Sequence, residues 1–187
     1  GATAAVSDDA VAEAEWKTGP ARHEAGSPNT VGAVALAAVC QALSDEAWPE
    51  LVAREESLRS RLSTGLSEIP GVRRLHLFGA DSPRVGTVTF TVDGLPSGLA
   101  AAALSAEHGI GVRDGLFCAH PLTRRLVKES GTLCGDGSAL RASIGLGSSI
   151  DDVDRLIEAT ARLSSTGPKW TYATVDSRVA PTPDPRA

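Results

Sequence analysis

One change in hydrophobic period divides the chain into a helical first part and an α/β remainder. Apolar residues between Thr30 and Leu43 occur on nearly every side of a helix, which predicts a buried helix capped by Asn29 or Thr30. Leucines at helical spacing predict a second helix over residues 48–68. The turn signal at residues 70–71, Pro-Gly, ends this helix.

From residue 72 the period becomes two, which is typical of strands. The first strand is expected within residues 72–78, with Leu75 and Leu77 facing inward. In the next one, apolar residues alternate with threonines, which predicts a half-buried strand at residues 87–92. Its apolar members are Val88, Phe90 and Val92.

Shorter elements continue the alternation of helices and strands. Ser97 can cap a helix that ends at His108, with Gly109 as the residue after its last turn. Residues 110–112 and 140–144 predict the third and fourth strands, because β-branched or alternating apolar residues fill them. The helices and strands therefore alternate up to residue 144.

The last predicted helix begins at a sequence typical of a capping box, with Ser149 as the cap and Asp152 in place of Glu. One or two helical turns are expected near residues 122–127, and the last ten residues are expected to be loose. The order of elements predicts an α/β fold, a small two-layer sandwich with a mixed sheet and helices on one face.

The composition is that of a globular protein, and it narrows the possible functions. The 187 residues are 42% hydrophobic and 22% charged, with a net charge of −5. This acidic balance argues against a nucleic acid as partner, and no apolar run reaches the length of a membrane span. Three cysteines, an odd number, are not a disulfide framework, so a reducing cytoplasm is the expected location.

A metal site is not expected. A zinc site can be imagined from Cys118, His120, Cys134 and His108, but the chain has no C-x-x-C pair. The candidate chemistry instead gathers in residues 112–122 (VRDGLFCAHPL), a loop with an arginine, a thiol and an imidazole. Loops at strand ends often display reactive groups, so Cys118 is either a reactive thiol or a small buried hydrophobe.

Two other positions have both a structural and a functional interpretation. The turn residues around Ser27 precede a helix, which suits a simple turn with a cap, or an anion site made by backbone N–H groups. Arg141 lies in a predicted strand, where it is either a solvated surface arginine or a bidentate ligand for a carboxylate.

Three segments in the same order resemble the class V aminotransferases, the pyridoxal-phosphate family that includes the cysteine desulfurases. Residues 22–29 (RHEAGSPN) are similar to the family's R-x-E-A-G-[ST]-P-N segment. Residues 112–121 (VRDGLFCAHP) resemble its V-R-x-G-x-x-C-A-x-P loop, and residues 140–143 (LRAS) resemble its R-A-S strand. The resemblance covers roughly residues 20–165.

The resemblance implies that the chain is the C-terminal part of a fold type I transferase that uses pyridoxal 5'-phosphate. It divides the chain into residues 1–29 from the large cofactor domain, linking helices at 30–70, a small α/β domain at 71–165 and a Pro-rich tail at 166–187. The complete enzyme is expected to act on an amino acid as a homodimer.

The family's Schiff-base lysine lies upstream of the R-x-E-A-G-[ST]-P-N segment. None of the three lysines of this chain stands in a similar context: Lys17, Lys128 and Lys169. We therefore expect the chain alone to be inactive. The alternative is a non-catalytic, truncated module for folding or dimerisation.

The resemblance also implies roles for individual residues. Cys118 matches the desulfurase cysteine, the catalytic nucleophile that receives sulfur as a persulfide and can pass it to an acceptor protein. Arg141 matches the arginine that binds the substrate α-carboxylate, and Arg113 matches a loop arginine that positions the loop or the substrate. Gly26 and Ser27 match the segment that reaches the cofactor phosphate of the partner subunit.

The loop departs from the family pattern at three positions. Leu116 and Phe117 stand where desulfurases often have two histidines, and His120 replaces the more usual Gln or Met. The apolar residues remove groups that can transfer protons, so a transaminase, lyase or epimerase reaction on another amino acid stays open.

Overall fold

The computed structural model describes residues 4–6, 14–24, 26–46, 48–79, 82–133 and 136–186. The chain divides into two compact units, residues 1–48 and 49–187. No helix in the described ranges is both long enough and apolar enough to span a membrane.

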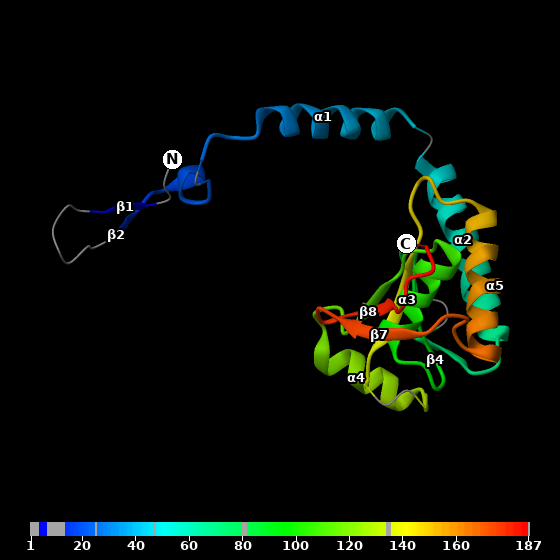
Figure 1. Ribbon diagram of the computed structural model, residues 1–187. Helices are drawn as coiled ribbons and strands as arrows, with labels where there is room; N and C mark the ends of the chain where they lie inside the picture. The colour runs from blue at the N-terminus through cyan, green and yellow to red at the C-terminus, as the bar shows by residue number, and fades with distance from the viewer. Residues whose placement is uncertain are drawn as a thin grey trace. The chain divides into compact units, whose positions relative to one another are not determined.

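The first unit contains a small hairpin and one long helix (Figure 1). Strand β1 (Ala4–Val6) pairs antiparallel with β2 (Ala14–Trp16), and a short 3-10 helix follows at Gly19–Arg22. Helix α1 (Thr30–Asp45) begins where the sequence predicts, because the Asn29 side chain accepts a hydrogen bond of 2.8 Å from the backbone N–H of Gly32.

Helix α1 is exposed, so the prediction that it is buried is wrong for this chain. Val31 is 80% exposed and Val34 is 72% exposed, and the helix has no buried residue. Periodicity reports how apolar a helix is on each side, but burial also needs a surface that covers it. The described residues of the first unit provide no such surface.

The second unit is built on a four-stranded sheet in the order β3-β4-β6-β5, and every neighbouring pair is antiparallel. The mixed sheet expected from the sequence is therefore not observed. The reason is that β6, late in the chain, lies between β4 and β5. The strands are β3 (Val72–Leu75), β4 (Thr87–Val92), β5 (Arg113–Gly115) and β6 (Ala139–Ser143).

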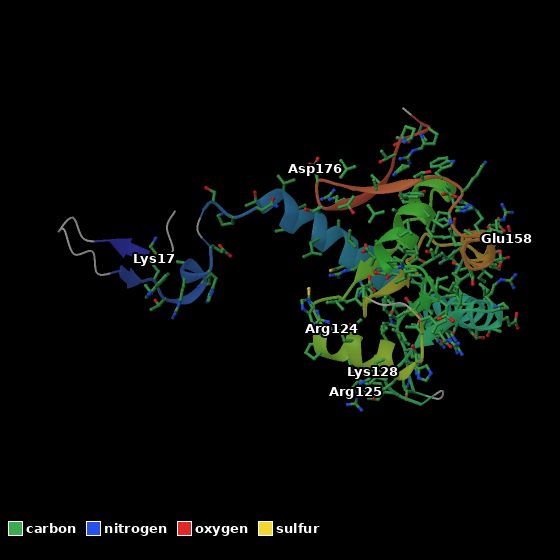
Figure 2. The ribbon with its side chains drawn as sticks, turned by 60° about the horizontal axis from the view of Figure 1, so that its bottom comes forward. Lys17, Arg124, Arg125, Lys128, Glu158 and Asp176 are labelled. Carbon is green, nitrogen blue, oxygen red and sulfur yellow. The ribbon has the colours of Figure 1, made fainter. Side chains whose placement is uncertain are left out.

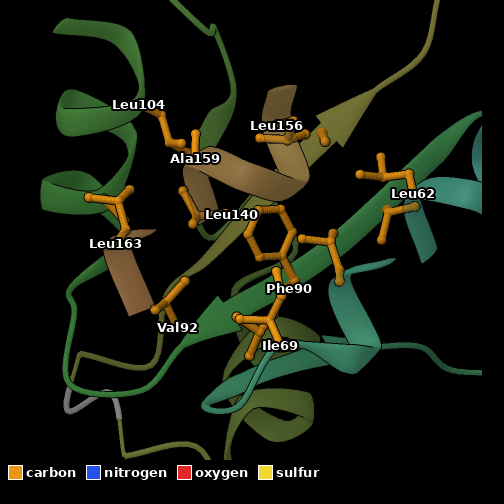
Figure 3. Close-up of a cluster of buried hydrophobic side chains, with 14 of the residues drawn as sticks. Leu62, Ile69, Phe90, Val92, Leu104, Leu140, Leu156, Ala159 and Leu163 are labelled. Atoms are coloured by element: carbon orange, nitrogen blue, oxygen red, sulfur yellow. The ribbon is translucent and has the colours of Figure 1, made fainter. Parts of the chain in front are cut away.

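Three helices cover one face of this sheet and form the core with it: α2 (Trp48–Glu68), α3 (Ser97–His108) and α5 (Ile150–Thr166). Figure 3 shows the Phe90 ring in the middle of this cluster, with Leu62, Leu140 and Leu156 around it. Helices α2 and α5 run side by side (Figure 1), and the Nε of Arg61 donates to Asp154 at 2.6 Å.

Of the three helix-end signals predicted for α3 and α5, two are confirmed. Ser149 and Asp152 form the predicted capping box, and Gly109 ends α3 with a φ of 66°. Ser97, however, is not the cap of α3, which is Pro96. The hydroxyl of Ser97 lies instead 2.6 Å from that of Ser138, and both residues are buried.

Two predicted strands have other bounds. Strand β3 ends at Leu75, so Leu77 lies outside the sheet and is 56% exposed, instead of facing inward. The third strand is β5, at Arg113–Gly115, and residues 110–112 lead into it without pairing. A short apolar run shows where a chain can be buried, but strand partners far away in sequence decide which residues pair.

The C-terminal tail forms a hairpin, although its last ten residues were expected to be loose. Strand β7 (Tyr172–Val175) pairs with β8 (Arg178–Pro181), and β8 packs against α3. Glu107 of α3 holds the entry to the hairpin, because its carboxylate accepts hydrogen bonds from the backbone N–H groups of Lys169 and Trp170 and from the hydroxyl of Tyr172. Burial and this bond to Glu107 raise the pKa of Tyr172.

Candidate functional site

The pairing of three strands sets two arginines side by side on the sheet face opposite the helical core. Arg141 of β6 pairs with Thr89 of β4 on one side and with Arg113 of β5 on the other. Directly paired residues point to the same face, so these three side chains form a row across the sheet. Their neighbours Phe90 and Leu140 point to the core.

A tight turn follows β5 and displays Phe117 and Cys118. The backbone N–H of Ala119 donates to the carbonyl oxygen of Leu116 at 2.9 Å, and φ is 53° at Phe117 and 59° at Cys118. Side chains rarely adopt this left-handed conformation, which costs roughly 1–2 kcal/mol at each residue. The hydroxyl of Thr123, a buried residue, also donates to Leu116 at 3.1 Å and so helps to hold the turn.

The Phe117 ring contacts both arginines of the row. The guanidinium carbon of Arg141 lies 5.5 Å from the ring centroid, and that of Arg113 lies 5.8 Å from it. Each contact is a cation–π interaction, worth about 0.5–1 kcal/mol when exposed. The ring therefore fixes two positive groups on the same face of the molecule.

Cys118 is exposed, and its sulfur accepts a hydrogen bond from Nη2 of Arg113 at 3.8 Å. Of the two interpretations of Cys118 from its sequence, the small buried hydrophobe is therefore wrong. His120, two residues further on, is exposed and begins helix α4 (His120–Glu129). This helix is longer than the one or two turns expected at residues 122–127.

Arg141 has an unused donor. Its Nε is buried and has no hydrogen-bond partner among the described residues. A buried N–H without an acceptor is costly, about 1–3 kcal/mol, so such a group is expected to meet an acceptor that is part of the function. A carboxylate suits it, because a guanidinium binds carboxylates through two parallel hydrogen bonds.

Arg141 and Phe117 line a cavity of about 680 Å³, a size common for small-molecule sites. Residues of α2, α4, the end of β3 and the polar face of the sheet line it, together with Phe117 and Arg141. Helix α4 thus lies on the face of the sheet that the other helices leave open, so the prediction that the helices cover only one face is wrong for this helix. Its lining residues are Leu122, Thr123 and Leu126.

Gly26 and Ser27, the other predicted site residues, belong to the first unit, whereas Cys118, Arg113 and Arg141 belong to the second. Ser27 is exposed, and a Cβ added at Gly26 would meet no atom within 4 Å. The structure therefore brings together three of the five predicted residues. Their roles, and those of Gly26 and Ser27, stay predictions.

Sequence reasoning did not find the parts that Phe117, Thr89 and Thr123 play in this site. In the sequence Phe117 is only a departure from the family pattern, Thr89 is one of the alternating threonines of a strand, and Thr123 has no distinguishing signal. A signal for Thr89 exists in retrospect: the threonine face of β4 must face something polar or partly covered.

The chain belongs to the class V aminotransferase family, whose model, described as aminotransferase class-V, matches residues 1–156. The predicted fold class, the C-terminal part of a fold type I pyridoxal-phosphate enzyme, is confirmed by the solved structures to which the chain is similar. Members of this family depend on pyridoxal phosphate.

The similar proteins are named as cysteine desulfurases. A probable cysteine desulfurase of Pseudomonas aeruginosa is 35% identical over 150 residues, which cover 80% of this chain and 34% of that protein. One of Pseudomonas putida is 33% identical over 146 residues, covering 78% of this chain and 33% of that protein. The chain therefore spans about one third of the length of these curated relatives.

Solved structures agree with this assignment. The crystal structure of the cysteine desulfurase CsdA of Escherichia coli, in an S-sulfonic acid form, has a TM-score of 0.62 and 28% identity, covering 87% of this chain and 37% of that one. The apo cysteine desulfurase of Thermococcus onnurineus has the same TM-score and identity, with 85% and 37% covered.

The described residues fit the substrate side of such a site but not the cofactor's covalent link. Arg141 offers a buried, unpartnered donor for a carboxylate, and Cys118 offers an exposed thiol. A Schiff base needs an amine inside the site, whereas all three lysines are exposed and none lines the cavity. Figure 2 labels two of them, with Lys128 beside Arg125 on α4; the three are Lys17, Lys128 and Lys169.

Within the described ranges, no three His, Cys, Asp or Glu side chains are placed to hold a metal ion. Cys134, one of the ligands considered for zinc, lies outside the described residues.

Proposed function

We propose that this chain is the C-terminal part of a pyridoxal-phosphate enzyme that acts on an amino acid, and that its reaction is cysteine desulfuration. The observation that carries the proposal is the contact between Arg113 and Cys118 beside Arg141, whose buried Nε has no hydrogen-bond partner among the described residues. The names of the relatives support it, because they are cysteine desulfurases of which this chain resembles one third.

In this proposal each residue has one task. Arg141 binds the α-carboxylate of the substrate through its guanidinium, which sets the direction of the amino acid in the cavity. Arg113 holds the sulfur of Cys118 toward the substrate. Pyridoxal phosphate, when bound, supplies the electron sink that takes the electron pair of the substrate's C–S bond.

Cys118 then acts as the nucleophile. Its thiolate attacks the substrate sulfur, so that a sulfur–sulfur bond forms, the carbon–sulfur bond breaks and a persulfide remains on the protein. The electron pair of the broken bond ends on the substrate carbon, which takes up a proton, so that the amino acid released is alanine. Because Cys118 is exposed, this sulfur is open to an acceptor protein. The apolar Leu116 and Phe117 exclude water from the arginine side of the turn, and they leave proton transfer to groups outside it.

Gly26 and Ser27 are proposed to contact the cofactor phosphate of the partner subunit in a cytoplasmic homodimer. The divisions of the chain at residues 29, 70 and 165 are proposed as the domain limits of the complete enzyme. For the 187-residue chain by itself we propose no turnover, because its exposed lysines offer no amine to the cavity. Its alternative role is that of a folding or dimerisation module. If pyridoxal phosphate is added to such a module, no Schiff-base absorbance should appear.

The test uses the full-length protein loaded with its cofactor. Cys118→Ala should lower sulfide release from cysteine by at least about 100-fold, as expected when a covalent nucleophile is removed. Cys40→Ala is the matched control, since Cys40 is also a free, exposed cysteine, and it should leave the rate unchanged. Unchanged sulfide release in Cys118→Ala, or turnover of another amino acid without sulfide, would refute the desulfurase proposal.

A further inference from the structure

The cavity reaches well beyond the predicted site, to a region where strand β3 ends and the chain leaves the sheet. Arg74 and Arg84 line this region, together with His76. Neither the family motifs nor the proposed desulfuration gives these residues a task.

The charged side chains that line the cavity are basic. The lining includes four arginines and one histidine, and no Asp or Glu is among its described residues: Arg59, Arg74, Arg84, Arg141 and His76. Arg59 is neutralised by its ion pair with Glu56. Arg74 and Arg84 form no ion pair with a carboxylate among the described residues.

Both guanidinium groups are held in place by neutral acceptors. Nη1 of Arg74 donates to the hydroxyl of Ser63 on α2. Nη2 of Arg84 donates to the carbonyl oxygens of Phe78 and Gly79, at 2.8 and 2.9 Å. A guanidinium has five N–H donors, so each group keeps others for a ligand. Side chains that are already positioned lose less entropy when they bind.

This region is distinct from the Arg141 end of the cavity. Arg74 pairs with Phe90 and so belongs to the helix side of the sheet edge, whereas Arg141 pairs with Thr89 on the opposite face. Their strands are separated by β4, which places the two backbones roughly 10 Å apart at the usual strand spacing. The two side chains therefore leave the sheet on opposite faces, from strands that are not neighbours.

We propose that Arg74 and Arg84 form a second anion site, which binds an oxyanion of the carboxylate or phosphate type. The hydroxyl groups of Ser60 and Thr64 also line this side of the cavity and can donate to such a group. The oxyanion is either the distal acidic group of an amino acid held by Arg141 or a separate phosphate-type ion. The first source rests on the proposed function, and the second does not.

The experiment measures anion binding by calorimetry on the full-length protein loaded with its cofactor, so that the cofactor's own phosphate contacts are satisfied. Inorganic phosphate is one probe, and glutamate compared with glutamine is the other. We expect one of the two anions to bind. Arg74→Gln and Arg84→Gln should each weaken that binding at least fivefold, and Arg84→Lys should retain part of it.

Arg125→Gln is the charge-matched control, because Arg125 is exposed on α4 and does not line the cavity. Phosphate binding that depends on Arg74 and Arg84 identifies a free anion, and a preference for glutamate over glutamine that depends on them identifies an acidic substrate. The proposal is overturned if neither anion binds, or if Arg125→Gln weakens binding as much as the cavity variants. The same titrations in Cys118→Ala should give unchanged anion binding. The anion-binding result can therefore be interpreted even if the desulfurase proposal fails.

Discussion

Arg141 combines features that favour binding over stability. Its Nε is buried without an acceptor, and its charge lies beside that of its strand partner Arg113. The only compensation among the described contacts is the Phe117 ring. A residue with this balance is expected where a ligand supplies the missing acceptor, since natural proteins accept a local loss of stability at functional positions.

Replacing Arg141 with methionine should therefore stabilise the fold while it weakens substrate binding. Removing the unsatisfied donor gains about 1–3 kcal/mol, whereas the lost cation–π contact costs about 0.5–1 kcal/mol. We expect Arg141→Met to raise the free energy of unfolding by about 1 kcal/mol in urea titrations. Binding of an amino acid should weaken about tenfold or more, because a charge-assisted hydrogen bond is lost.

Arg125→Met serves as the comparison, since Arg125 is exposed and its ion pair among the described residues is with Glu129 of its own helix. This variant should change neither the free energy of unfolding nor the binding of an amino acid appreciably, because exposed ion pairs of this type contribute little. A marked loss of stability in Arg141→Met would contradict the argument, since it would mean that the buried Nε has a partner in solution.

At the residue scale, the sequence predicted which candidate side chains lie together better than it predicted how they are held. The motifs brought Cys118, Arg113 and Arg141 together, and the structure places them on one face. The motifs did not predict that Phe117 would lie against both arginines. That contact depends on a left-handed turn, and Phe and Cys are not residues that signal one.

At the scale of elements, Asp93 joins three parts of the second unit. Its carboxylate follows β4 and accepts hydrogen bonds from the hydroxyl of Thr132 and the backbone N–H of Leu133, at 2.9 and 3.1 Å. Arg73 of β3 lies 3.5 Å from it. Burial acts to raise the pKa of Asp93, but these bonds and the charge of Arg73 outweigh it and hold the pKa below its usual value.

Asp93→Asn should therefore destabilise the protein in a pH-dependent way. A carboxyl whose pKa is lowered by folding stabilises the native state at pH values above its unfolded pKa, about 3.9. This stabilisation is lost as the pH falls through the lower, folded pKa. We expect a difference of about 1–2 kcal/mol between the two proteins at pH 7, shrinking steadily below pH 4, measured by urea unfolding at several pH values. A difference in the free energy of unfolding between the two proteins that is the same at pH 3 and pH 7 would contradict this role of the Asp93 carboxylate.

The sequence predicted elements well when their signal is local. The bounds of α2 and the alternation of β4 were found, because each signal is complete within about 20 residues. The position of β6 between β4 and β5 was not predicted, because it depends on pairing between segments about 50 residues apart. The β7–β8 hairpin was missed for a related reason: its anchor, Glu107, lies on α3.

At the scale of the whole molecule, burial is concentrated in the second unit. All of the buried hydrophobic side chains described lie between Leu58 and Leu163, and α1 contributes none. An isolated helix of this length is only marginally stable in water, because tertiary packing supplies most helix stability in proteins. The apolar residues of α1 therefore do not secure it in this chain as they would under a covering surface.

Helix α5 offers a close comparison, since it has 17 residues and α1 has 16, but α5 packs into the core. In hydrogen exchange of the 187-residue chain, we expect the amides of α1 to be at least about 100-fold less protected than those of α5. Local opening needs little free energy where few side chains are buried, whereas α5 opens only when the core does. Equal protection would mean that α1 is covered in solution. In the full-length protein, protection of α1 should rise if the rest of the enzyme packs against it, while that of α5 stays the same.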